Sequence, residues 1–337
     1  MTPAELAERW TDLASARRSS RGMKRRRLDA AAAVDVFACI FWPHGRAGLL
    51  IEGDGRASDL ADRVPRCRGV RVVVEESSGD ATPQRTILVI MLEQERLREI
   101  FGVLSADLVN AIISEPSGPA ALRRCIDRLC MWQGLFERLA PEGLSEERQR
   151  GLFGELYILD QLFLGGKEVL AGVDAWVGAE SSHQDFRRGG LAVEVKTSLS
   201  KRHSRITIAS EKQLDERPHV HLLLAHVRLD ESEGLGISLP DLVANVRNSL
   251  SGDESASRLF DERLLLADYL DVHAPQYETR YRPASVRYFR VEGDFPRLAE
   301  WNLPPGVGDI RYTIIADELG TWEMDATSVV ALVGETM

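Results

Sequence analysis

The stretch "DFRRGGLAVEVK", Asp185 to Lys196, sets a Gly-Gly pair between two runs in which apolar and polar side chains alternate. Gly-Gly is among the favoured pairs for a two-residue hairpin loop, because both positions need a positive φ. Counting outward from the loop places Arg188 opposite Leu191, Phe186 opposite Val193 and Asp185 opposite Glu194. The stretch therefore predicts a β-hairpin with this register.

Side chains alternate between the two faces of a strand, so the register also sorts the residues of the hairpin. One face is apolar and predicts a core, formed by Phe186, Leu191, Val193 and Val195. The other face is mostly polar, and it receives His183, Asp185, Ala192, Glu194, Lys196 and Ser198.

Two carboxylates on the polar face, Asp185 and Glu194, would have Cβ atoms roughly 4.5–5.5 Å apart and would repel each other. A divalent cation compensates such a pair, since Mg²⁺ takes one or two carboxylates and keeps water and phosphate as its other ligands. Lys196 on the same face could position the attacking water or neutralise phosphate charge. This set is typical of metal-dependent phosphodiester hydrolysis. The alternative is a solvated outer face on which Lys196 pairs with one of the two acids.

A helix is expected directly before the hairpin, over "EERQRGLFGELYILDQLFL", with Ser145 as its N-cap. Glu155 falls on the apolar face of this helix, where an unpaired charge is costly and requires a partner such as a metal or a lysine. The alternative is a glutamate at the helix edge that reaches solvent.

The 337 residues are 44% hydrophobic, and the formal net charge is −10, which argues against a protein that coats nucleic acid through bulk charge. Two stretches are nevertheless basic, 17–27 and 196–205, and they suit a protein that meets DNA at one face; a solvated arm is the alternative for 17–27. The four cysteines form no C-x-x-C pair, so we expect buried thiols. The first residues lack a secretory h-region and no run could cross a bilayer, so we expect a cytoplasmic protein without membrane contact.

Four regions are expected along the chain: a basic arm over 1–28, an α+β region over 29–143, a mixed-sheet core over 144–252 and a C-terminal α+β region over 253–337. In the second region we expect strands at 32–42, 45–53, 70–77 and 85–93, then helices at about 93–113 and 119–139. In the third we expect strands at 173–179, 183–188, 191–198, 205–210 and 220–227, with a short helix at 210–216. In the last region we expect one helix at 258–270 and strands at 285–293 and 309–317.

An acid on one strand (Asp185), E-V-K on the next (Glu194 to Lys196) and a glutamate on a preceding helix (Glu155) resemble the PD-(D/E)xK phosphodiesterase superfamily of restriction-endonuclease-like nucleases. The αβββαβ order over about 146–228 fits that fold. More narrowly, "GLFGELYIL", "HQDF", "VEVKTS", "ITIASEKQL" and "FPRL…LPPGVGDIRYTI" resemble a bacterial family of PD-(D/E)xK motif proteins. That family tends to be encoded beside DNA methyltransferases and other restriction or phage-defence genes.

The resemblance implies a restriction-endonuclease-like core that binds Mg²⁺, with Mn²⁺ as a substitute. It implies Asp185, Glu194 and the Val195 carbonyl as ligands, and Lys196 as the lysine that positions water. It also implies Glu155 as an auxiliary acid and ligand, and Gln213 as a polar residue facing the site. The chain departs from the motif at Gln184, which stands where the name of the motif has proline.

Phosphate or DNA contacts are expected from His183, Ser198, Lys201 and Arg202, and the alternative for His183 is a structural histidine whose hydrogen bonds are satisfied. A zinc site is not expected from His219, His221 and His226, because His226 would face away from the other two. The sequence thus indicates a metal-dependent DNA endonuclease or the nuclease subunit of a restriction or defence system. Its partners would be DNA and other proteins of the operon, and a homodimer is open. The alternative is a catalytically inactive scaffold that keeps the fold and binds DNA or a partner subunit.

Overall fold

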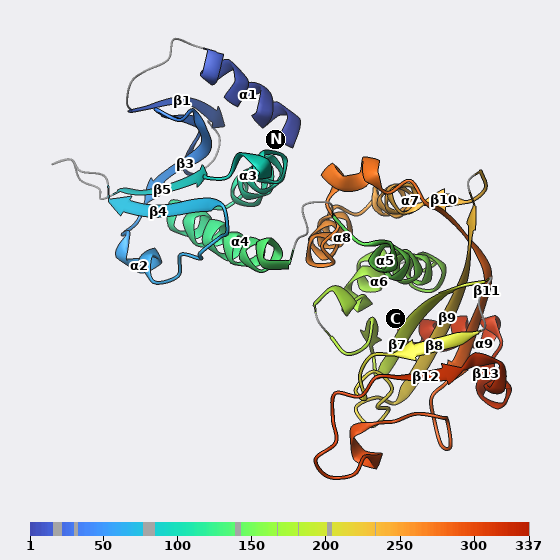
Figure 1. Cartoon of the computed structure of the whole chain (residues 1–337). Helices are drawn as coiled ribbons and strands as arrows, with labels where there is room; N and C mark the ends of the chain where they lie inside the picture. Colours follow the sequence, from blue (N-terminus) through green and yellow to red (C-terminus); the bar gives the residue numbers. More distant parts are fainter. Residues whose placement is uncertain are drawn as a thin grey trace. The chain divides into compact units, whose positions relative to one another are not determined.

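The computed structural model describes residues 1–15, 22–29, 33–76, 85–138, 143–166, 168–180, 182–200, 204–232 and 234–336. The chain divides into two compact units, Met1–Pro141 and Glu142–Met337 (Figure 1). Each unit mixes helices and strands, as the sequence predicts.

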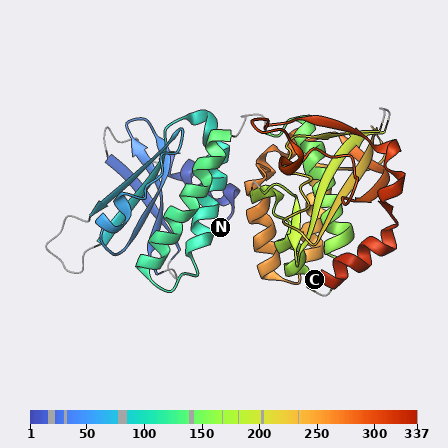
Figure 2. The ribbon, with the colours of Figure 1, turned by 90° about the horizontal axis from the view of Figure 1, so that it is seen from below.

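The first unit is built on an antiparallel sheet with the strand order β1-β2-β3-β5-β4. Its strands are β1 (Gly22–Asp29), β2 (Asp35–Trp42), β3 (Arg46–Asp54), β4 (Val70–Glu76) and β5 (Arg85–Leu92). Its helices are α1 (Pro3–Ser15), α2 (Ser58–Ala61), α3 (Arg98–Ile112) and α4 (Gly118–Arg138). Helices α3 and α4 lie side by side along the sheet (Figure 2). The four strands and two helices expected between 32 and 139 are confirmed.

The expected N-terminal arm is wrong for the described residues of 1–28. Helix α1 packs into the unit through Trp10, which is 1% exposed and donates from Nε1 to the carbonyl of Gly48 at 3.0 Å. Strand β1 pairs with β2 along most of its length, and Arg25 forms an ion pair of 2.5 Å with Glu52. The basic run is therefore partly an edge strand whose charges are balanced by the neighbouring strands.

The second unit is built on a mixed sheet with the order β10-β11-β9-β7-β6, and β13 pairs with β11. Its strands are β6 (Phe186–Arg188), β7 (Leu191–Leu199), β9 (His221–Ser232), β10 (Ile237–Ser238), β11 (Arg280–Arg290) and β13 (Glu323–Met324). Strands β7 and β9 are parallel, whereas β6 and β11 run antiparallel to their neighbours. A parallel central pair buried on both faces explains why the run "LLLA" of β9, residues 222–225, is continuously apolar and buried.

One face of this sheet is covered by helices. They are α5 (Glu146–Ile158), which continues through a wider turn over Leu159–Phe163, α6 (Val169–Ala175), α7 (Leu239–Leu250), α8 (Glu254–Leu266) and α9 (Ala326–Thr336). Leu191, Val193 and Val195 of β7 join the core on this face. Ser145 caps α5 by accepting a hydrogen bond from the Arg148 amide, as the sequence predicts.

The opposite face is covered in part by a separate two-stranded sheet, β8 (Arg205–Ile208) with β12 (Tyr312–Ile315). Ile206, Ile208 and Ile314 of this pair pack with Ala192 and Leu224 of the main sheet. The boundary expected at 252/253 does not divide the structure, because β11 and β12 from the C-terminal region pair with β9 and β8. Residues 142–337 form one unit.

Several expected elements differ from the structure. Of the strand expected at 173–179, residues 173–175 lie in α6 and 178–180 form a short 3-10 helix, and the expected helix at 210–216 is a series of turns. In these turns the side chains bond to nearby backbone, since the Ala209 amide donates to Gln213 Oε1 at 2.8 Å. Helix α7, which begins with a capping box of Ser238 and Asp241, and helix α9 were not expected. The simple αβββαβ order is therefore not reproduced.

Within the described ranges, no helix is both long and apolar enough to cross a membrane.

Candidate active site

The hairpin has the expected register. Phe186 pairs with Val193 and Arg188 with Leu191, and the loop glycines Gly189 and Gly190 have φ of 53° and 85°. In the part of the chain that the structure describes, β6 pairs only with Leu191–Val193, so the rest of β7 forms an open edge of the sheet.

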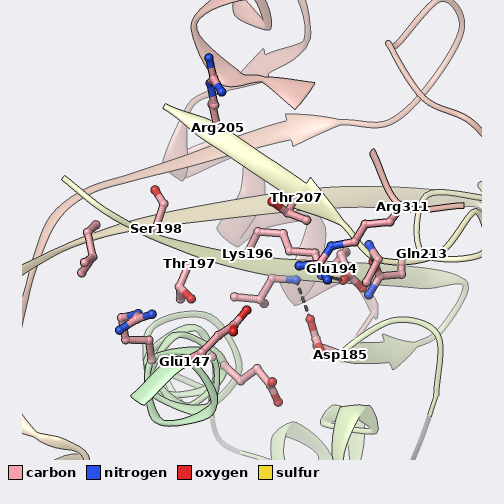
Figure 3. Close-up of a pocket in the computed structure, with 16 residues that line it drawn as sticks. Glu147, Asp185, Glu194, Lys196, Thr197, Ser198, Arg205, Thr207, Gln213 and Arg311 are labelled. Atoms are coloured by element: carbon pink, nitrogen blue, oxygen red, sulfur yellow. Dashed lines mark hydrogen bonds and ion pairs between the residues drawn. The ribbon is translucent and has the colours of Figure 1, made fainter. Parts of the chain in front are cut away.

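A cavity of about 1140 Å³ lies at this open edge. It is lined by Glu147, Arg150, Gly151, Glu155, Asp185, Glu194, Val195, Lys196, Thr197, Ser198, Leu199, Arg205, Thr207, Ala209, Gln213 and Arg311. Figure 3 shows α5 on one side of the β7 residues and the strand with Thr207 and Arg205 on the other. The cavity brings together Glu155, Asp185, Glu194, Lys196 and Gln213, five side chains singled out in the sequence.

Asp185 directly precedes β6, where both its backbone and its side chain are fixed. Its carbonyl accepts hydrogen bonds from the amides of Val177 and Gly178 at 2.8 and 2.9 Å. Its carboxylate Oδ2 accepts from the Val195 amide at 2.7 Å. Because the N–H and C=O of one strand residue point to the same side, the Val195 carbonyl also points to the open edge of the sheet.

Glu194 lies at the bottom of the cavity with a side chain that is only 1% exposed. Its Oε1 lies 2.7 Å from the Nζ of Lys196, whose side chain is 20% exposed. Its second oxygen, Oε2, is buried and has no hydrogen-bond partner among the described residues. A buried carboxylate oxygen without a partner is costly, so this atom marks a place for a cation or a bound water.

Glu155 reaches the cavity from α5 and lies close to Asp185. Trp176 Nε1 donates a hydrogen bond of 2.8 Å to Glu155 Oε2. A Cβ added at Gly178 would stand 2.8 Å from Asp185 Oδ1 and 3.2 Å from Glu155 Oε2. Only a glycine at position 178 leaves room for both carboxylates in their present positions.

The electrostatics of the site favour a bound cation. Burial, and then the charge of Asp185, raise the pKa of Glu155 to about 8. Burial raises the pKa of Asp185 to about 6 and, together with the charge of Asp185, raises the pKa of Glu194 well above its usual value. Burial opposes the charge of Lys196, but Glu194 and Asp185 outweigh it and raise the pKa of the lysine. One lysine thus balances three carboxylates, and further positive charge would stabilise their ionised forms.

This donor set fits a hard divalent cation. No group of three or more His, Cys, Asp or Glu side chains in the described ranges converges as a complete metal site. Mg²⁺ does not need one, because it is commonly held by one or two carboxylates with water and phosphate as the other ligands. Asp185, the free oxygen of Glu194 and the Val195 carbonyl offer oxygen ligands of this kind.

The remaining expected site residues have different outcomes. Gln213 and Ser198 line the cavity, and Ser198 Oγ lies 2.8 Å from Nε2 of the buried His226. The placement of His183 was wrong: it is exposed in a bend before β6 and does not line the cavity. The strand pairing ends at Phe186, so the alternation could not be extended back to residue 183. Lys201 and Arg202 lie outside the described residues.

The structure also explains the departure from the motif at Gln184. Its Nε2 donates to the carbonyls of Lys212 and Gln213 at 2.9 and 3.3 Å, and its Oε1 lies 3.2 Å from His219 Nε2. Gln184 therefore ties the turn that carries Gln213 to the start of β6. His219 is engaged here and His226 bonds to Ser198, so the histidines form no common site.

Sequence reasoning did not name three arginines that line the cavity, Arg150 of α5, Arg205 of β8 and Arg311, as site residues, although Arg205 lies in the basic stretch 196–205. The alternation in "RITI" was a signal for Arg205, because it separates two buried isoleucines from two outward-facing residues. Arg311 had no local signal, since its position depends on the pairing of β12 with β8 across about a hundred residues of chain.

Comparison with known protein families matches residues 6–317 to a family described as "Putative PD-(D/E)XK family member". No curated protein and no solved structure matches the chain. The family match covers nearly the whole chain, including both units and every residue of the cavity, and PD-(D/E)XK proteins are generally nucleases that use divalent metal ions. The chain therefore belongs to this PD-(D/E)XK family.

Proposed function

We propose that this protein is a metal-dependent endonuclease that hydrolyses phosphodiester bonds in DNA, acting alone or as the nuclease subunit of a restriction or phage-defence system. The observation that carries the proposal is the meeting of Glu155, Asp185, Glu194 and Lys196 in one cavity, with one oxygen of Glu194 left without a partner among the residues that the structure describes. Family membership supports nuclease chemistry, and the acidic cluster supports Mg²⁺, with Mn²⁺ as a substitute.

The roles follow from the positions of the groups. Asp185, Glu194 and the Val195 carbonyl would hold the cation, which would supply a Lewis acid and a more acidic water when bound. Lys196 Nζ forms an ion pair with Glu194 Oε1 in this structure, and it is placed to donate a hydrogen bond to the attacking water or to a phosphate oxygen. Glu155 is placed to accept a proton from that water, and the Trp176 indole orients it for this role.

One observation favours a second candidate, a non-catalytic subunit that keeps the fold and binds DNA or a partner protein. The ion pair between Lys196 and Glu194 already neutralises one of the carboxylates that the nuclease needs for its metal. In a scaffold this pair would be permanent, whereas in a nuclease the lysine would turn to the substrate.

Cleavage of supercoiled plasmid distinguishes the nuclease from the non-catalytic scaffold. Methylated and unmethylated plasmid would be incubated with Mg²⁺ or Mn²⁺ and wild type, Lys196→Ala or Lys212→Ala. Lys212 is a matched control, because it is exposed near the site and does not line the cavity.

The nuclease proposal expects cutting by the wild type and by Lys212→Ala, and none by Lys196→Ala. Cutting by all three would assign the activity to another site or to a contaminant. No cutting by any of them, also after the proteins encoded beside it are added, would favour the scaffold.

A further inference from the structure

We propose that the β8–β12 sheet is the DNA-strand-binding wall of the cavity, and that Arg205 and Arg311 bind the phosphates of one strand. This inference rests on the proposed function for the identity of the ligand. It assigns substrate binding to the C-terminal segment, because Arg311 directly precedes β12.

The wall has one apolar face and one polar face. Along β8, Ile206 and Ile208 are buried, whereas Arg205 and Thr207 are exposed and line the cavity. Along β12, Ile314 is buried and Thr313, the partner of Thr207, is exposed. By the same alternation, Arg311 stands on the face of Thr313. The face opposite the core is thus a surface with a cation at each end and hydroxyl groups between them, and the exposed Ile315 lies beside Arg205.

Among the described residues, the two arginines lack the acidic partners that several other arginines of this unit have. Arg287 is paired with Glu323, Arg297 with Glu216, and Arg150, on the α5 side of the cavity, lies 3.6 Å from Glu231. Among the described residues, no carboxylate forms an ion pair with Arg205 or Arg311. Two such guanidinium groups facing an open cavity are suited to phosphates, which they can bind through several N–H donors.

Arg311 is held in place by its neighbours. The Ile310 amide donates to Oε2 of the buried Glu211 at 3.1 Å, and Tyr312 pairs with Ile208. Figure 3 shows Arg311 extending beside Gln213 toward Lys196 and Glu194, with Arg205 at the far end of its strand. Arg311 is therefore placed for a phosphate at the reaction centre, and Arg205 for one further along the strand.

The spacing suits a nucleic-acid strand. Arg205 and Ala209, the residue beside Arg311, are four positions apart, which corresponds to about 13 Å along a strand. One DNA strand advances about 3.4 Å per nucleotide along the helix axis, so the wall spans roughly four nucleotides. Thr207 and Thr313 lie between the two arginines and can donate to intervening phosphates.

Binding of fluorescently labelled duplex DNA, followed by anisotropy in EDTA over a range of salt concentrations, tests the wall without requiring cleavage. The proteins would be wild type, Arg311→Ala, Arg205→Ala, Arg311→Lys and Arg258→Ala. Arg258 is a matched control, since it is exposed on α8 in the same unit and does not line the cavity. Thermal unfolding would verify that every variant is folded.

We expect each alanine variant in the wall to weaken binding about tenfold for any sequence. Each should also reduce the magnitude of the slope of log K against log salt by about 0.9. Arg311→Lys should keep the slope, and Arg258→Ala should match the wild type. Wall variants that bind like the wild type would overturn the inference, as would a wild type that binds no DNA.

Plasmid cleavage by the same proteins separates this inference from the proposed function. If the wild type cuts and Arg311→Ala binds and cuts equally well, the nuclease stands and the wall is overturned. If binding depends on Arg205 and Arg311 and no protein cuts with any metal, also after the proteins encoded beside it are added, the wall stands and the nuclease proposal fails.

Discussion

The indole Nε1 of Trp176 donates a hydrogen bond to Glu155 Oε2 at 2.8 Å, although Glu155 lies in α5 and Trp176 in the segment that follows α6. Trp176 is fully buried, and its carbonyl accepts a hydrogen bond from Arg263, itself 4% exposed. The acid on α5 is therefore oriented by the segment after α6, which the core holds in place.

Trp176→Phe tests this orientation. It removes the hydrogen bond and leaves the carboxylate of Glu155 buried without its donor, so we expect a loss of about 1–3 kcal/mol in the free energy of unfolding. Cleavage should slow while the affinity for DNA is unchanged. Urea denaturation and plasmid cleavage measure the two effects. Trp301→Phe is the control, because Trp301 is 48% exposed and lies outside the cavity. Equal effects of the two variants would contradict the assignment.

The stability of the metal-free protein should fall as the pH rises from about 4 to about 8, because the folded pKa of Asp185 is about 6 and that of Glu155 about 8. Both values lie above the ordinary ones, so in this window the folded state binds more protons than the unfolded state. Each such proton contributes a slope of up to about 1.4 kcal/mol per pH unit. Urea denaturation in EDTA at several pH values measures the slope. It should be smaller in Glu155→Gln and unchanged in Glu292→Gln, an exposed control; the same slope in all three would refute the prediction.

Mg²⁺ or Mn²⁺ should raise the melting temperature of the wild type, because a cation that binds only the folded state adds about 2.7 kcal/mol at a hundred times its Kd. The rise should be larger at high pH, where protons compete less for the carboxylates. It should be lost in Asp185→Asn and kept in Asp294→Asn, a control on an exposed turn. Differential scanning fluorimetry measures the shift, and a shift that survives in Asp185→Asn would place the metal elsewhere.

Gly178→Ala should damage the site at a small cost to the fold. The new methyl group would stand 2.8 Å from Asp185 Oδ1 and 3.2 Å from Glu155 Oε2, so both carboxylates must move. A displacement of about 1 Å in a reacting group can cost a hundredfold in rate, and we expect a loss of that order in cleavage. Gly334→Ala in α9 is the control, because nothing lies within 4 Å of its added methyl group. Full activity of Gly178→Ala would show that the carboxylates are not held as closely as their positions indicate.

The sequence predicted the hairpin, its register and the residues on its polar strand face well, because these features depend on residues close together in the sequence. Gly189–Gly190 fixed the turn, and the period of two then placed Glu194 and Lys196 on one face. The same rule failed for His183, because pairing stops at Phe186 and the chain bends before it. Periodicity describes a strand but does not show where the strand ends.

The arginines of the cavity show a second limit of sequence reasoning. Arg311 belongs to the site only because β12 pairs with β8, and no spacing within either segment indicates that pairing. Gln184 is a similar case, because its side chain donates hydrogen bonds to backbone carbonyls of a turn that was expected to be a helix. Side chains whose contacts are made with segments far away in the sequence can be identified only from the folded structure.

The short β6 strand has a consequence for solubility as well as for chemistry. A sheet edge with free amides and carbonyls can recruit a strand from another molecule, and proteins avoid this by placing charges there or by occupying the amides. Beyond Val193, the carboxylate of Asp185 occupies the Val195 amide of the β7 edge. Asp185, which would hold the metal, thus also blocks part of the sheet edge, and we expect a variant that removes its carboxylate to expose the Val195 amide as well as to lose the metal ligand.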